Sequence, residues 1–386
     1  MNKLRFMTTG ESHGKGILSI LEGMVAGLLI DEDMITYELK RRQAGYGRGG
    51  RMKIESDTAE ILSGVRYGYT IGSPISIYIQ NKDWKNWRDK MSVNPVETTA
   101  EPITSPRPGH ADLAGMIKYG TGDTRPVLER ASARETAARV AAGAVAKKFL
   151  EVFDITVHSH TIGIGKVNIC GEIDIDWQKV ENSPVRCADD IAEKAMITTI
   201  DEAKAAGDTL GGILEVVIYG VPVGLGSYVQ WDRRLDMRIA GAIMSIQAVK
   251  GVEIGPGCAL ASMMGSEAHD IIEPDSQNIK KKWSRPTNNA GGIEGGMTNG
   301  EPVIIRAALK PIATLGKPLK SIDMSTGDTT QAHYERSDIC VVPAAGVIGE
   351  AMAALVLADA MLEKFGGDTL SEISDNYRNY IWNAKE

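Results

Sequence analysis

The sequence predicts a soluble, globular fold of mixed α-helix and β-strand. Short runs with the alternation or composition of strands recur at residues 4–9, 59–65, 74–80, 152–164, 212–219 and 302–309. Longer stretches with the apolar spacing or composition of helices lie between them, at 34–43, 133–149, 188–206, 233–250 and 344–365. Because 43% of the 386 residues are hydrophobic, the chain can bury a sizeable core without disulfides.

The first predicted strand and the first predicted helix each lead into a glycine-containing turn. The strand at 4–9 runs into residues 10–16, which are not a P-loop because the glycine spacing is one residue short and no Ser or Thr follows the lysine. Asp33 is the predicted N-cap of the helix at 34–43, which Gly45 ends. The helix therefore carries basic residues to the start of the next loop.

Residues 41–51 put four arginines and four glycines into one short stretch of a chain whose net charge is −7. Arginine presents a planar fork of donors that fits a phosphate or a carboxylate, and glycine lets the backbone approach a ligand closely. Local positive charge in an acidic protein indicates a small anionic ligand rather than a long polyanion. A solvated, charged turn that closes the helix is the alternative interpretation.

Two nucleotide-related interpretations of this stretch fail on their context. Gly45, Gly47 and Gly50 satisfy the G-x-G-x-x-G pattern, but a dinucleotide site must follow a hydrophobic strand, and this stretch follows a charged helix end. Residues 48–51 look like one RGG unit, yet nucleic-acid-binding segments of that kind are repetitive and belong to basic proteins. We therefore expect neither a Rossmann site nor nucleic-acid binding.

Four later polar stretches are further candidates for binding. Residues 81–101 are polar, irregular and tryptophan-bearing, which predicts a surface excursion or a lid. In 105–112, two prolines and a glycine fix an arginine and a histidine in a loop. The glycine- and asparagine-rich stretch 288–300 either meets a ligand or turns the chain, and 310–314 adds a cation and a hydroxyl that could hold phosphate.

The sequence favours neither a metal site, nor export, nor a membrane span. His158 and His160 fall on one face of a predicted strand, but no third ligand lies near them. The four cysteines are widely spaced and fit a reducing cytosol. Residues 1–16 are too polar for a signal peptide, and the longest apolar candidate, 351–362, is well short of the roughly 20 residues that a membrane span needs.

Seven segments resemble, in the same order, those of the chorismate synthase family: 10–16, 45–52, 107–112, 129–136, 228–233, 288–300 and 335–338. The resemblance covers nearly the whole chain. It implies an α+β fold, a β-α-β sandwich of antiparallel sheets packed with helices, as a single domain over 1–386 with 370–386 as a C-terminal tail. It also implies a cytoplasmic homotetramer.

The reaction implied by the resemblance is the last common step of the shikimate pathway to the aromatic amino acids. In it, 5-enolpyruvylshikimate 3-phosphate loses phosphate by a trans-1,4 elimination and becomes chorismate. The reaction needs reduced FMN although there is no net redox change, so the enzyme would be a carbon–oxygen lyase and a flavoprotein.

The resemblance also assigns roles to side chains. His13 matches the histidine proposed to protonate the leaving phosphate, and His110 the one proposed to protonate reduced FMN. Asp338 matches the aspartate thought to help the flavin accept the ring proton, with Ser12 and Ser132 at the suggested relay serines. The substrate-facing arginines match Arg48, Arg51, Arg107, Arg134 and Arg336. Fixed guanidinium groups can stabilise a leaving phosphate, and histidine exchanges protons near neutral pH.

For the cofactor, the resemblance implies FMN contacts at Arg130, Ala131, Ser132, Gln247, Ala248, Gly295, Lys310, Pro311, Ile312, Ala313, Thr314 and Arg336. Ala131 replaces a serine that often stands there, so a contact at this position is left to the backbone. Arg42 and Arg48 match positions that have been assigned to NADP, although Arg48 is also claimed for substrate. The family pattern leaves no room for a reductase domain, so we expect an external flavin reductase, with NADPH as a candidate external reductant.

Two other functions stay open as alternatives. A flavin-dependent oxidoreductase using the same pocket would consume one reductant per turnover. A flavin- or RNA-binding regulatory protein would bind RNA in a strongly salt-dependent way without turnover.

Overall fold

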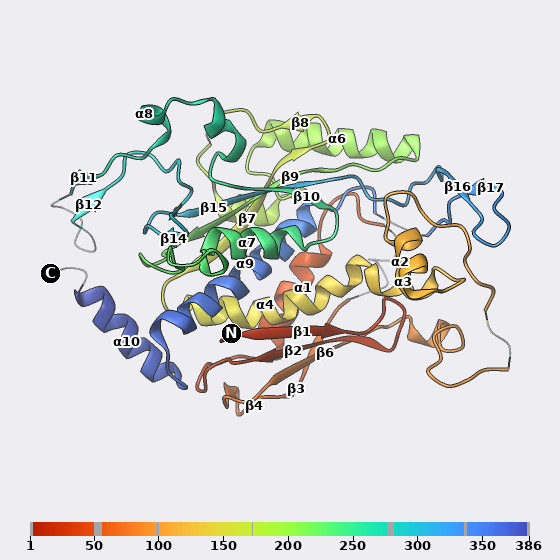
Figure 1. Cartoon of the computed structure of the whole chain (residues 1–386), viewed down its shortest axis with the longest axis horizontal. Helices are drawn as coiled ribbons and strands as arrows, with labels where there is room; N and C mark the ends of the chain where they lie inside the picture. The colour runs from red at the N-terminus through yellow and green to blue at the C-terminus, as the bar shows by residue number, and fades with distance from the viewer. Residues whose placement is uncertain are drawn as a thin grey trace.

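Two antiparallel sheets enclose a layer of helices (Figure 1). The structure is a computed structural model that describes residues 3–49, 56–97, 100–171, 173–275, 282–335 and 338–383. The first sheet has the order β1 (Arg5–Thr9), β2 (Gly16–Glu22), β6 (Ile75–Gln80) and β3 (Ala59–Ser63). The second has the order β10 (Val249–Ile254), β15 (Val303–Leu309), β9 (Gly212–Tyr219), β7 (Thr156–Ile164) and β8 (Val167–Asn168).

Three helices form the layer between the sheets: α1 (Glu32–Gln43), α4 (Thr136–Glu151) and α9 (Val342–Phe365). The other helices are α2 (Asp112–Tyr119), α3 (Arg125–Ala131), α5 (Trp177–Asn182), α6 (Asp190–Ala206), α7 (Leu235–Met244), α8 (Gly265–Ala268) and α10 (Leu370–Asn383). Two-stranded ribbons pair β4 (Val65–Arg66) with β5 (Tyr69–Thr70), β11 (Glu273–Pro274) with β12 (Trp283–Ser284), β13 (Ile293–Glu294) with β14 (Met297–Thr298), and β16 (Lys320–Ile322) with β17 (Thr329–Gln331). The arrangement confirms the predicted α+β sandwich.

Strand alternation places the core between the sheets. In β6 the side chains of Ile75, Ile77 and Ile79 are fully buried, and β6 packs on α4. In the second sheet, β15 and β9 pair without a register shift from Val303↔Ile218 to Leu309↔Gly212. The loops that follow β1 and β15 are therefore held by well-paired strands.

Helix α9 is the centre of the core. It is long and apolar enough to cross a membrane by length and composition, but 94% of its most apolar window is buried inside the protein. A helix that is apolar on all sides is expected where other elements surround it. At its crossing with α4, a Cβ added to Gly143 would lie 2.3 Å from the Cβ of Ala351, so the two helices touch backbone to backbone.

A buried ionic cluster joins α9 to α1, α4 and β7. The carboxylate of Glu350 accepts hydrogen bonds from Arg41 at 2.6 Å, Lys147 at 2.8 Å and Ser159 at 2.7 Å, with Arg186 at 3.3 Å. Burial alone would raise the pKa of Glu350, but Lys147 and Arg41 outweigh it and hold this pKa well below its usual range. The cluster thereby fixes α1, the helix that leads into the loop that carries Arg48.

Several predicted boundaries are wrong by a few residues. The N-cap of α1 is Asp31 rather than Asp33, because the Asp31 carboxylate accepts the backbone N–H of Met34. The strand predicted at 152–164 begins only at Thr156, since α4 continues to Glu151.

The predicted long helix at 233–250 is wrong in its last third. The apolar spacing of Ile243, Ile246 and Val249 is helical, yet α7 ends at Met244. Ala248 has φ +72°, and Val249 then pairs with β15. Gly251, the expected end of the helix, lies inside β10.

Strand β2 and helix α10 are among the elements that were not predicted from the sequence. Strand β2 pairs with both β1 and β6 in the middle of its sheet, where apolar residues occupy both faces. Residues 370–383 of the expected C-terminal tail form helix α10.

Candidate active site

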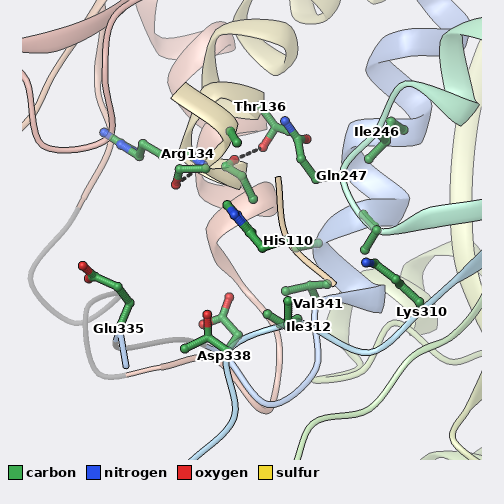
Figure 2. Close-up of a pocket in the computed structure, with 18 of the residues that line it drawn as sticks. His110, Arg134, Thr136, Ile246, Gln247, Lys310, Ile312, Glu335, Asp338 and Val341 are labelled. Carbon is green, nitrogen blue, oxygen red and sulfur yellow. Dashed lines mark hydrogen bonds between the residues drawn. The ribbon is translucent and has the colours of Figure 1, made fainter. Parts of the chain in front are cut away.

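A cavity of about 590 Å³ collects residues from seven separate segments of the chain. They come from the loops after β1, α1 and β15, the turn before α2, the junction of α3 and α4, the turn before β10, and the start of α9. The predicted site residues that line it are Ser12, His13, Arg42, Arg48, Arg107, His110, Ala131, Ser132, Arg134, Gln247, Ala248, Lys310, Pro311, Ile312, Ala313, Thr314 and Asp338. Figure 2 shows His110 near the centre of the view, with Gln247 above it and Ile312 and Asp338 below.

His13 is held by a buried carboxylate and by an aromatic ring. Its Nδ1 lies 2.8 Å from Oε1 of Glu129, and its backbone N–H donates to Oε2 of the same residue at 2.7 Å. The imidazole stacks on Trp87 with ring centroids 3.8 Å apart. The stretch predicted as a surface excursion or lid therefore packs one tryptophan on a predicted catalytic histidine.

His110 is held in a similar way by Asp112. Its Nδ1 lies 2.5 Å from Oδ1 of Asp112, whose other oxygen accepts from Nε of Arg107 at 2.8 Å. Burial would raise the pKa of Asp112, but the hydrogen bonds from His110 and Arg107 outweigh it and hold this pKa well below its usual range. Arg107 also donates to the hydroxyl of Thr314 at 3.0 Å, which ties this loop to the one after β15.

The arginines of the cavity are fixed by protein acceptors. Arg134 donates to Asp57 at 2.5 Å and to the amide oxygen of Asn81 at 3.0 Å. Arg42 donates to the hydroxyl of Thr136 at 2.9 Å and to a backbone carbonyl at 3.0 Å. Because these guanidinium groups are already oriented, an anion bound beside them requires little rearrangement of the protein.

The described lining is cationic on balance. Six of its side chains carry positive charge and two carry carboxylates; the eight are Arg42, Arg48, Arg107, Arg134, Lys250, Lys310, Glu335 and Asp338. The charge of one carboxylate is partly neutralised within the protein, since Asp338 lies 3.2 Å from Arg48 and also accepts the backbone N–H of Gly49 at 2.6 Å. A small multivalent anion fits this charge distribution better than a neutral ligand.

The lining also includes aliphatic side chains and an unusual polar atom. Ala131, Ile246, Ile312 and Val341 contribute aliphatic surface. The side-chain oxygen of Gln247 is buried and accepts no hydrogen bond from any residue that the structure describes. A flat, mainly apolar ring system with a hydrogen-bond donor at its edge would satisfy both features. The residues present therefore fit a flavin.

The two predicted relay serines are neighbours, with the Ser132 hydroxyl 3.2 Å from that of Ser12. Two predicted cofactor contacts are not among the lining residues. Arg130 is exposed and donates to the backbone oxygens of Thr8 and Gly10, and Gly295 lies in the β13–β14 turn. Two more predicted site residues, Arg51 and Arg336, lie outside the described residues.

Sequence reasoning missed the residues that hold the site residues in place. Asp112 lies only two positions after His110, so a local signal for this pair existed. Glu129 lies 116 positions from His13 and Asp57 lies 77 positions from Arg134, so nothing in local spacing joins them. Asp112 and Glu129 lie in segments that the sequence singled out and Asp57 does not, and none of the three partnerships was predicted.

His158 and His160 have protein partners. His158 stacks on Trp177 with ring centroids 4.7 Å apart, and His160 lies 3.0 Å from the carboxylate of Glu215. Within the described ranges, no group of three or more His, Cys, Asp or Glu side chains is placed to hold a metal ion.

The fold and this cavity define an enzyme site for a small organic anion, with two carboxylate-bound histidines for proton transfer. The chorismate synthase family model matches residues 4–362. The chain is 54% identical to the chorismate synthase of Carboxydothermus hydrogenoformans over 98% of each chain, and 52% identical to that of Aquifex aeolicus over 99% of this chain and 98% of the other.

A solved structure described as the crystal structure of chorismate synthase superimposes with a TM-score of 0.80 at 44% identity, covering 99% of this chain and 98% of the other. The chain belongs to the chorismate synthase family. The resemblance inferred from the seven segments is thereby confirmed, as are the lyase class and the place in aromatic amino acid biosynthesis that the family name carries.

Proposed function

We propose that this cavity converts 5-enolpyruvylshikimate 3-phosphate to chorismate and phosphate by trans-1,4 elimination. The observation that carries the proposal is the pairing of His13 with Glu129 and of His110 with Asp112 in one cationic cavity. Histidines oriented by carboxylates are suited to proton transfer, and the substrate's phosphate and two carboxylates match the excess of guanidinium groups.

In this proposal the arginines bind and orient the substrate while histidines handle protons. Arg48, Arg107 and Arg134 neutralise its anionic groups, and the first two of these meet Asp338 and Asp112, so their forks are held in place. As the C–O bond breaks, His13 donates a proton to the departing phosphate. Asp338, Ser12 and Ser132 are the candidates for carrying away the proton lost from the ring. Arg51 and Arg336 complete the proposed arginine set.

Reduced FMN is the proposed cofactor. When bound, it would supply an electron-rich ring that lends electron density to the substrate during C–O cleavage. Gln247, Ala248 and residues 310–314 would hold it, with Ala131 and Ser132 on the adjoining segment. His110 lies in the same cavity and is the proposed proton donor to the reduced cofactor. The proposed contacts at Arg130 and Gly295 draw no support from the lining.

Other parts of the proposal rest on the family pattern. They are a single domain over 1–386, a homotetramer, a cytoplasmic location, an external flavin reductase, and NADPH as the reductant that supplies it. Arg42 and Arg48 are the proposed NADP positions; Arg48 is also a proposed substrate ligand.

The test is anaerobic turnover with reduced FMN in less than stoichiometric amount. Purified protein is mixed with the substrate, and chorismate and phosphate are followed together. Many turnovers per flavin, with the flavin still reduced at the end, are expected. Product that stops at one equivalent per flavin would indicate net redox chemistry. Binding of both ligands without product would mean that the chain has the family's fold but not the proposed activity.

A further inference from the structure

Glu129 is a buried carboxylate that lies behind His13, a lining residue of the cavity. Its side chain is fully buried in α3. One of its oxygens lies 2.8 Å from the ring Nδ1 of His13, and the other accepts the backbone N–H of His13 at 2.7 Å. Its own backbone carbonyl accepts from the N–H of Ser12 at 3.1 Å. One residue thus fixes both the backbone and the ring of the histidine.

The neighbours of Glu129 establish which way these hydrogen bonds run. Arg125 donates to Oε1 at 3.3 Å, and the backbone amide of His13 donates to Oε2. Neither donor can act as an acceptor, so both oxygens of Glu129 accept. Glu129 forms an ion pair with Arg125, and an ionised carboxylate has no proton to donate. The ring nitrogen at 2.8 Å is then the donor, and the proton of His13 lies on Nδ1.

The ring of His13 is also restrained on its face. Trp87 stacks on it at 3.8 Å with an interplanar angle of 25°, and Arg125 lies over the same tryptophan at 5.3 Å. Held by its edge and its face, the imidazole can exchange a proton with a ligand in the cavity only through Nε2.

We propose that Glu129 is the positioning residue for His13: it keeps a proton on Nδ1, so that Nε2 is the atom that delivers the proton to the departing phosphate. In the step, the Nε2–H bond breaks, a phosphate O–H bond forms, and the electron pair of the breaking C–O bond goes to the phosphate. His13 then regains a proton at Nε2 from solvent. The catalytic part rests on the proposed function, whereas the tautomer does not.

The substitution Glu129→Gln, which replaces the carboxylate with an amide, distinguishes the proposed role from a purely structural one. Glu129 offers two acceptor oxygens to the two donors of His13, with Arg125 also donating to Oε1, but the side chain of Gln offers one acceptor oxygen and one donor NH₂. Since the backbone N–H of His13 cannot become an acceptor, Glu129→Gln turns its NH₂ toward Nδ1. His13 is then forced into the Nε2–H tautomer and cannot hold protons on both nitrogens. Glu129→Asp keeps two acceptors.

The experiment measures the tautomer and the kinetics of three variants. Nitrogen NMR of histidine-labelled protein, with the His13 signals among the six histidines assigned by their loss in His13→Gln, reports which ring nitrogen carries the proton. We expect Nδ1–H in the unmodified protein and in Glu129→Asp, and Nε2–H in Glu129→Gln. We also expect kcat to fall about 10²–10⁴-fold in Glu129→Gln, with KM within about threefold, as for other histidines given the wrong tautomer. Glu129→Asp should recover to within about tenfold of the unmodified kcat.

Glu335→Gln is the matched control. Glu335 is the other carboxylate bound by Arg125, at 2.9 Å, and the histidine that it contacts is His333, at 3.2 Å, so this variant should keep Nδ1–H on His13. An unchanged tautomer in Glu129→Gln, or a folded Glu129→Asp that loses as much kcat as Glu129→Gln, would overturn the proposal. If the unmodified protein shows Nδ1–H but no turnover, the proposed function fails and the tautomer assignment stands. If Glu129→Gln does not fold, the tautomer and the kcat of Glu129→Asp test the proposal.

Discussion

The carboxylate of Asp338 accepts the backbone N–H of Gly49 at 2.6 Å and lies 3.2 Å from Nη1 of Arg48. A backbone bond from Ile339 to the carbonyl of Gly47, at 2.8 Å, joins the same two segments. The segment that leads into α9 therefore holds the loop after α1, which carries Arg48, against the cavity. Asp338 has this positioning role in addition to any role in proton transfer.

Replacement of Asp338 should separate those two roles. In Asp338→Ala both bonds are lost, and we expect KM for the substrate to rise about 10-fold or more, since a hydrogen bond to a charged group is worth about 1.5–3 kcal/mol. Asp338→Asn keeps an acceptor for Gly49, so its KM should change less. Steady-state kinetics on both variants checks this. An unchanged KM in Asp338→Ala would contradict the positioning role, and a large fall in kcat alone in Asp338→Asn would favour proton transfer.

Asp112 should make stability depend on pH in the acid range. The pKa of Asp112 is held below its ordinary value, so its contribution to stability is complete above about pH 3.9 and is lost as the pH falls below that. Asp112→Asn leaves the Arg107 charge buried without its carboxylate and should cost about 3–5 kcal/mol at pH 7. Denaturant unfolding at pH 7 and below pH 4 measures both. A difference between the two proteins that fails to shrink in acid would count against this account.

Gln247 should contribute to flavin affinity through its buried side-chain oxygen. Gln247→Leu removes an acceptor that no described residue satisfies, so oxidised FMN should bind about 5–10-fold more weakly, as expected for one hydrogen bond. Titration of FMN fluorescence measures the affinity without turnover. Gln178→Leu, on an exposed position of α5, is the control and should leave it unchanged. Equal affinities for the two variants would remove Gln247 from the proposed cofactor site.

Glu350 should be one of the costliest residues to neutralise. Glu350→Gln removes the fully buried carboxylate that Arg41 and Lys147 share and leaves only Glu38 and Glu181 to offset their charges. We therefore expect a loss of about 3–5 kcal/mol in the free energy of unfolding. The matched control is Glu151→Gln, which removes a half-exposed partner of Lys148 and should cost less than about 1 kcal/mol. Denaturant midpoints decide the comparison, and similar costs at the two sites would be unexpected.

Elements with a distinct local pattern could be predicted from the sequence. Strand β9 has its predicted limits because an apolar run is followed by a glycine, and α6 agrees to within two residues at its start. The apolar spacing gave a wrong prediction where one continuous pattern runs across two elements. Ile243, Ile246 and Val249 keep a helical spacing across the end of α7 and the start of β10, and only the pairing of Val249 with Leu309 distinguishes the two.

The site was predictable in its residue types but not in its connections. Histidines and arginines between glycines and prolines indicated a ligand, and the family resemblance gave them roles. The carboxylate of Glu129 reaches His13 only because α3 packs beside the loop after β1, and tertiary contacts of this kind leave no periodic trace. Gly295 shows the converse, since a matching sequence position lies outside the cavity lining in the folded chain.

Two glycines in helices should respond in opposite directions to the same substitution. Alanine favours a helix over glycine by about 1 kcal/mol, which would stabilise either helix in isolation. In α7, a Cβ added to Gly241 meets nothing within 4 Å, so Gly241→Ala should stabilise by about 0.5–1 kcal/mol. In α4, a Cβ on Gly143 would lie 2.3 Å from the Cβ of Ala351 and 2.6 Å from its Cα.

Since these are backbone and near-backbone atoms, α4 and α9 must move apart. Overpacking of a core costs about 1–3 kcal/mol, which exceeds the propensity gain, so Gly143→Ala should be destabilising. Thermal unfolding of the two variants under one condition gives the comparison. A rise in the melting temperature of Gly143→Ala would show that the two central helices can separate without loss of packing, and the close approach would then not be what fixes this core.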